Sequence, residues 1–154
     1  MDAPTRCRRI AAAAAAVAMA LVPGAVGAQG QSCIVSSWVD IVFGDYDPFA
    51  AAPLDSAGSI THRCPPNRPP RISLDRGGSA SFAPREMRFG AEVLRYNLYL
   101  DAACTMIWGD GSAGTHEYVA ATGRATVPVY GRVFPLQDPI IGAYTDTITV
   151  TIQF

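Results

Sequence analysis

The C-terminal stretch of the sequence places the strongest constraint on what this chain folds into. From Ile148 the even positions are all apolar, ending at Phe154, while the odd positions from Thr145 to Gln153 are threonine or glutamine. A period of two with β-branched residues on both faces predicts a half-buried strand, about 33 Å long over Thr145–Phe154 at about 3.3 Å per residue. Since an open strand edge invites pairing with other chains, the sequence raises the question of what lies beside this strand.

The N-terminal stretch predicts a secretory signal peptide. Three arginines within the first nine residues precede an apolar run, Ile10–Val22, and small residues follow up to Ala28. This order of basic, apolar and small residues is typical of a cleaved leader, and the apolar run is shorter than the roughly 20 residues that span a bilayer. We therefore expect a signal peptide over residues 1–28 and a single domain over residues 29–154, with no membrane span in the mature chain.

The charge balance argues against nucleic acid as a partner. The chain has 12 basic and 13 acidic residues and no lysine. Without the three leader arginines and Asp2, nine arginines stand against twelve acids, a formal charge of −3. No basic patch follows from such a balance.

Three cysteines remain after the leader, which carries Cys7, is removed: Cys33, Cys64 and Cys104. In the oxidising compartment that a leader implies, three cysteines allow one bridge and one thiol left over. A Cys33–Cys64 bridge would join the start of the first predicted strand to the end of the second and close a loop of about 32 residues, worth roughly 3–4 kcal/mol. Cys104 would then be a small packed thiol.

Short alternating segments separated by turn residues fill the rest of the chain. Turn signals recur every 8–12 residues and no helical period appears after the leader, which favours an antiparallel β-sandwich. Phe49–Ala57 and Ser79–Gly90 are expected to be irregular, and Pro128 should lie at a sheet edge or bulge. The predicted strands cover residues 33–43, 59–64, 71–75, 93–100, 105–108, 125–133 and 145–154.

The sequence offers no convincing catalytic or metal site. His62 and His116 lack ligand spacing, the serines lack a nucleophile-elbow pattern, and Asp45 and Asp47 are typical of turn chemistry. We therefore expect a non-enzymatic protein without a cofactor. A secreted hydrolase using Cys104 and His116 is the weakest alternative.

Several segments, in order, resemble the spore coat protein U domain, the pilin domain of archaic (Csu-type) chaperone–usher systems. Each segment alone is a weak signal, but the ordered set spans nearly all of Cys33–Phe154. The matching segments are 42–48, 58–64, 88–90, 94–100, 107–111, 129–132 and 142–150.

The resemblance implies an incomplete immunoglobulin-like antiparallel β-sandwich that lacks its last strand. It also implies export through the periplasm to a surface pilus, serving adhesion or biofilm formation. The expected partners are a periplasmic pilus chaperone, an outer-membrane usher and other pilin subunits, one of which supplies the missing strand. The expected walls of the strand-acceptor cleft are Val35, Val39, Ile41, Ile148, Val150, Ile152 and Phe154.

One feature departs from a fibre-shaft pilin. After cleavage at Ala28 only four polar residues, Gln29–Ser32, precede Cys33, and they offer no alternating apolar segment to donate. We therefore expect a tip or accessory subunit that accepts a strand. The alternative is a self-sufficient secreted β-sandwich that serves as a coat or binding protein.

Overall fold

The computed structural model describes residues 32–65, 68–121 and 123–154, so the predicted signal peptide lies outside the described residues. Within these ranges the secondary structure consists of strands and turns only. The strands are β1 (Ile34–Val39), β2 (Leu54–Arg63), β3 (Arg71–Leu74), β4 (Arg85–Phe89), β5 (Glu92–Tyr99), β6 (Tyr118–Val119), β7 (Arg124–Val133) and β8 (Val150–Gln153).

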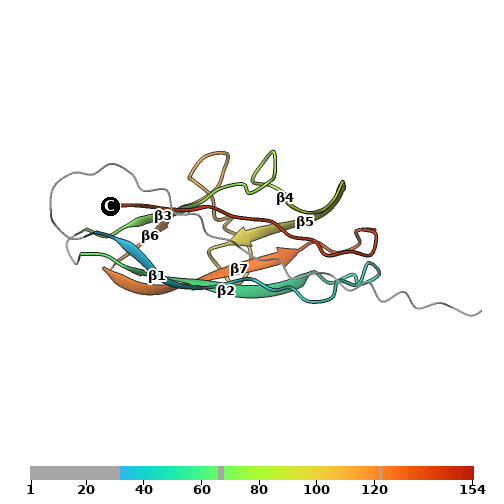
Figure 1. Cartoon of the computed structure of the whole chain (residues 1–154), viewed down its shortest axis with the longest axis horizontal. Helices are drawn as coiled ribbons and strands as arrows, with labels where there is room; N and C mark the ends of the chain where they lie inside the picture. Colours follow the sequence, from blue (N-terminus) through green and yellow to red (C-terminus); the bar gives the residue numbers. More distant parts are fainter. Residues whose placement is uncertain (1–31, 66–67, 122) are drawn as a thin grey trace, which may run out of the picture.

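The strands form two antiparallel sheets. The larger has the order β1-β2-β7-β5-β4 and the smaller the order β6-β3-β8. Figure 1 shows β2 and β7 in one layer and β3 with the C-terminal strand in the other, while β4 and β5 curl from the first layer towards the second. The fold is an all-β antiparallel sandwich, as the alternation of apolar residues predicted, and it is immunoglobulin-like, as the family resemblance implied.

The sandwich is closed along one side, at β4. The backbone N–H of Arg88 donates to the carbonyl of Thr145 at 2.9 Å, and the N–H of Thr145 donates back to Arg88 at 3.1 Å. Further along, β8 pairs with β3 from Arg71↔Gln153 to Leu74↔Val150. Among the described residues, the C-terminal segment is thus paired along one edge only, first with β4 and then with β3.

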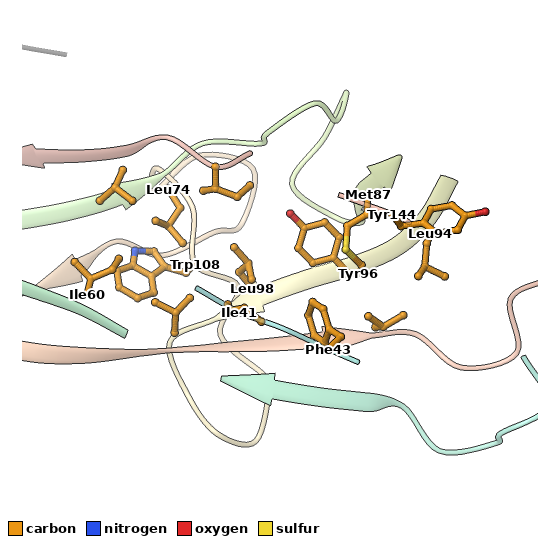
Figure 2. Close-up of a cluster of buried hydrophobic side chains, with 14 of the residues drawn as sticks. Ile41, Phe43, Ile60, Leu74, Met87, Leu94, Tyr96, Leu98, Trp108 and Tyr144 are labelled. Atoms are coloured by element: carbon orange, nitrogen blue, oxygen red, sulfur yellow. The ribbon is translucent and has the colours of Figure 1, made fainter. Parts of the chain in front are cut away.

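Apolar side chains from both layers meet in one core, shown in Figure 2. Trp108 is fully buried there, and its indole N–H donates to the carbonyl of Ile72 at 2.9 Å. Leu74 contributes from the smaller sheet, Ile148 from the segment just before β8, and Ile60 from the larger sheet. Each large side chain removed from water in this way contributes roughly 1.5–3 kcal/mol.

After β1 the chain leaves the sheet edge and crosses the inner face of the larger sheet. A methyl group built on Gly58 would collide with the carbonyl of Val39 and approach Ile41, and one on Gly131 would meet Phe43. Ile41 and Phe43 are buried. The two glycines therefore create the room through which residues 40–43 pass.

A disulfide joins Cys33 and Cys64, the expected pair, and it ties the start of β1 to the end of β2. Cys104 is the free thiol. It is half-buried in a turn where its own φ is 57°, so the expectation of a small packed thiol was only partly right.

Three predicted strands match the structure closely: 71–75, 93–100 and 125–133 correspond to β3, β5 and β7. Pro128 lies in the part of β7 that pairs with β2 but extends beyond the pairing with β5. The position of its missing N–H therefore faces a stretch of β7 that has no strand partner on this side among the described residues, in line with the prediction that this proline lies at an edge.

Other expectations were wrong. Residues 54–57, predicted as loop, extend β2, and residues 85–89, predicted as irregular, form β4. Residues 105–108 make only isolated bridges, Tyr99↔Ile107 and Trp108↔His116. The first and last strands are shorter than predicted, because ladder pairing begins only at Val150 in β8 and ends at Val39 in β1.

Candidate functional site

The candidate site is the side of the sandwich opposite β4, where β1 and β8 are the outer strands of their sheets. We call this side the open edge and define it as residues 34–43 and 148–154. No described residue forms a third strand between them. The two sheets are therefore linked at Arg88–Thr145 and left unlinked at the open edge.

The backbone of the C-terminal segment points hydrogen-bonding groups into the open edge. The carbonyl of Thr149 accepts from Asp75 N–H at 3.1 Å, on the β3 side. Since N–H and C=O groups alternate between the two edges of an antiparallel strand, the groups of Ile148, Val150 and Ile152 point the other way. No described residue pairs with the backbone of Ile148. This row of free donors and acceptors is what an added strand would need.

The first strand exposes apolar side chains along the same side of the molecule. Ile34 and Trp38 are each 48% exposed, and Val42 is 54% exposed. Beyond β1, residues 40–46 make no backbone–backbone hydrogen bond with a described residue, although Ile41, Phe43 and Tyr46 are buried.

A β-bulge in β1 changes which side chains face inward. The register shifts between Val35 and Ser37, after which Trp38 pairs with buried Ile60 and Val39 pairs with Ser59. In the sequence Val35, Val39 and Ile41 share one parity and Trp38 has the other, so alternation alone predicts that the first three face one way and Trp38 the opposite way. That grouping was wrong, because the extra residue of a bulge inverts the parity that follows it.

A narrow space lies between the two outer strands. It is lined by Trp38, Val39 and Ile41 on one side and by Leu74 and Val150 on the other, with Leu98 and Val129 among the residues beneath. Its volume is about 10 Å³, roughly the room for one water molecule. The side chains around this space thus leave little empty volume above the core.

The seven expected cleft residues fall into three groups. Ile41, Ile148 and Val150 are buried, and Val35 and Ile152 are partly buried against the core. Val39 and Phe154 are 62% and 56% exposed. The geometry brings Val39, Ile41 and Val150 together around one space, and their role as acceptor walls remains a prediction.

Sequence reasoning missed Trp38 and the two glycines. Trp38 faces inward yet stays half exposed, so it marks the uncovered mouth. A signal that could have indicated the crossing was present. Gly131 interrupts the apolar row Val127, Val129 and Val133, and Gly58 lies two residues before Ile60 in its strand. A glycine inside a strand often marks a close backbone approach.

His62 lies beneath the open edge, in register with Val35. Its side chain is fully buried, its Nδ1 is 3.9 Å from the sulfur of Cys64, and its Nε2 makes no hydrogen bond with a described residue. Burial lowers the pKa of His62 below its ordinary value, because the charged form loses its hydration.

The described residues contain no group of three or more potential metal ligands. In the same ranges there is no helix of the length and hydropathy that crossing a bilayer requires.

The fold and the site define a class of protein: an antiparallel β-sandwich that is closed on one side and carries unpaired strand edges on the other. The sequence matches the family model of the Spore Coat Protein U domain over residues 20–151. A relative, Protein U of Myxococcus xanthus, is 31% identical over 141 residues, covering 81% of this chain and 79% of that protein. The chain belongs to the Spore Coat Protein U domain family.

A solved structure shares the fold. It is the CsuC-CsuE chaperone-tip adhesion subunit pre-assembly complex from archaic chaperone-usher Csu pili of Acinetobacter baumannii. The match has a TM-score of 0.57 and 22% identity, and it covers 80% of this chain. The present chain spans 40% of the length of the matched chain in that complex.

Proposed function

We propose that this chain is a non-enzymatic structural subunit of a chaperone–usher surface pilus. In this proposal the chain is exported through the periplasm and completed at the open edge by a strand from a chaperone or a neighbouring subunit. The observation that carries the proposal is the pair of unpaired edges, β1 and β8, over a continuous apolar core. Membership of the Spore Coat Protein U domain family and the likeness to a subunit solved with its chaperone support it.

The incoming strand would add main-chain hydrogen bonds to the row at Ile148, Val150 and Ile152, with alternate side chains covering the core. Val35, Val39 and Ile41 would form the other wall, with Trp38 folding over the added strand. Phe154 would lose its exposure in the same step. Each large apolar side chain covered would contribute roughly 1.5–3 kcal/mol.

A tip or accessory position, with a role in adhesion or biofilm formation, is the finer part of the proposal. It rests on the four polar residues that would remain before Cys33 after cleavage at Ala28. Sequencing the N-terminus of the exported protein checks it, because a start well upstream would restore an apolar segment to donate.

The second candidate is a self-sufficient coat or binding protein. The small volume of the space at the open edge, about 10 Å³, favours it, because the side chains around that space leave little room for an inserted side chain. The family to which this chain belongs is named for the spore coat, which also supports this reading.

Co-expression with a candidate periplasmic chaperone separates the two. We expect the chain to co-purify with the chaperone and to aggregate without it. Ile152→Pro removes one N–H that points into the open edge and leaves the β3 ladder untouched, so it should abolish co-purification. Thr151→Ala, at the exposed neighbouring position, is the matched control. A soluble, cooperatively folding monomer produced without a chaperone would favour the second candidate and contradict the first.

A further inference from the structure

A second pocket lies on the outer face of the larger sheet, away from the open edge. It has a volume of about 530 Å³ and lies over β5, between the loop before β4 and the loop after β7. That volume is within the roughly 300–1,000 Å³ typical of small-molecule sites. Its walls include Pro84, Ile107, Phe134 and Pro135, and its floor is formed by Arg95, Asn97 and Tyr99 of β5.

The amide of Asn97 is oriented by two donors. Arg85 Nη1 donates to Asn97 Oδ1 at 2.8 Å, and the backbone N–H of Leu98 donates to the same oxygen at 3.0 Å. Guanidinium and backbone nitrogens only donate, so the oxygen is fixed and the NH₂ end must be the other end of the amide. The residue is 1% exposed, yet its Nδ2 has no hydrogen-bond partner among the described residues and is not closed off from solvent.

A donor that has no acceptor within the protein is available to a ligand, and a hydrogen bond to it contributes to binding. Asn97 lines the pocket, and its oxygen is committed to Arg85 and Leu98 on the other side. The amide nitrogen therefore offers two N–H groups to an occupant of the pocket.

Arg95 supplies a free positive charge at the rim. It lies two residues before Asn97 on the same face of β5, about 6.6 Å away along the strand. Its guanidinium makes no ion pair or hydrogen bond with a described residue. The residue opposite in the ladder, Glu86, is already paired with Arg88 at 2.8 Å.

The rim is held in place before any ligand binds. Gln137 Oε1 accepts from the backbone N–H of Arg95 at 2.7 Å, and Gln137 Nε2 donates to the Arg95 carbonyl at 2.9 Å and to the Phe134 carbonyl at 2.8 Å. The backbone N–H of Phe134, just beyond the end of β7, also donates to the Arg95 carbonyl at 3.2 Å, so the Gln137 side chain reinforces this end of the pairing between β5 and β7. A fixed rim reduces the ordering cost of binding.

We propose that this pocket binds a carboxylate carried on a ring that has an apolar face. The carboxylate lies between the Arg95 guanidinium and the Asn97 amide, and the ring packs against the proline and phenylalanine walls. Two sources share this chemistry, the sugar acid of an acidic glycan and an aromatic acid. The pocket is separate from the open edge, so this inference goes beyond the proposed function.

The test measures binding of sodium glucuronate, sodium benzoate and glucose to the full exported chain, purified in whatever assembled state it adopts, by calorimetry and by amide chemical shifts. We expect glucuronate or benzoate to bind and to shift the amides of Arg95 and Leu98, and glucose to bind at least about tenfold more weakly. Preference for glucuronate identifies a glycan source, and preference for benzoate identifies an aromatic acid.

Two variants and one control make the test specific. Asn97→Asp keeps an acceptor for Arg85 but replaces the free donor with a carboxylate oxygen, and Arg95→Gln removes the charge from an exposed position. Each should weaken binding about tenfold or more, equivalent to about 1.4 kcal/mol. Arg63→Gln, at the exposed last residue of β2, removes an equal charge elsewhere and should leave binding unchanged. Absence of binding by both acids, equal binding of glucose, or unchanged affinity in Arg95→Gln would overturn the proposal.

Discussion

Arg85 shows how a single residue can be essential to the core while its type suggests the surface. It is fully buried and makes four hydrogen bonds: two to the carbonyl of Asp75, one to the carbonyl of Trp108 and one to Asn97. Its guanidinium also lies 5.2 Å from the ring centre of Phe82. The planar fork reaches acceptors on three segments at once, which a lysine cannot do.

Arg85→Lys should therefore destabilise the fold on the order of 3 kcal/mol, since it leaves buried carbonyls without donors. Chemical denaturation of the purified chain measures the loss. Arg71→Lys, whose side chain is 60% exposed and pairs with Glu117 at 3.3 Å, is the control and should cost less than about 0.5 kcal/mol. Equal losses in both variants would contradict the role assigned to Arg85.

His62 gives the fold a pH dependence of predictable sign. Burial lowers the pKa of His62 in the folded state, so the unfolded chain takes up a proton first as the pH falls below about 6.5. Stability should therefore begin to fall as the pH drops below about 6.5, before most carboxylates titrate. His62→Gln should flatten this part of the profile and exposed His116→Gln should not. A profile from thermal unfolding that stays steep in His62→Gln would argue against this residue as the cause.

At the scale of elements, the strands that the sequence predicted well are those with a clear local pattern of apolar residues or turn residues. β7 alternates cleanly in burial, β5 has apolar residues at alternate positions from Leu94 to Leu98, and β3 is short but bounded by proline and glycine. β4 was missed because its inward residues are Arg85 and Met87. An arginine in an inward position carries no local signal, since only the carbonyls of distant segments make that position favourable.

The open edge was predictable only in part, because only part of it follows the alternation of apolar residues. Alternation placed Ile148 and Val150 on the inward face, where the structure has them. It failed at Val39 because the bulge at Ser36 has no composition that announces it, and because the path of residues 40–43 depends on glycines in two other strands.

That path yields a prediction for Gly58. A methyl group here collides with the backbone at Val39 and not with a flexible side-chain end. Gly58→Ala should therefore displace residues 39–41 and cost roughly 1–3 kcal/mol. Gly78→Ala, where the nearest atom is an ordinary 3.6 Å away, should be nearly neutral. Denaturation midpoints compare the two, and a neutral Gly58→Ala would show that the segment does not rely on this opening.

At the scale of the whole molecule, the sandwich is joined along one side and left unjoined along the other. Fusing an alternating apolar segment to Phe154 through a flexible Gly/Ser linker should complete it in cis. If two large core side chains become covered, the thermal midpoint should rise by about 10 °C or more. The same linker and segment with serine at the inward positions is the control. Equal midpoints for the two fusions would show that the open edge is not an acceptor.

The two tryptophans of the chain occupy opposite situations, with Trp108 sealed in the core and Trp38 half exposed at the mouth of the sandwich. Their fluorescence therefore reports on two different events. A soluble quencher should reach Trp38 and spare Trp108 in the free chain, and arrival of a covering strand should protect Trp38 and shift its emission to shorter wavelength. Unfolding should expose both. Without any added label, the molecule carries one optical reporter for its own integrity and another for the occupancy of its open edge.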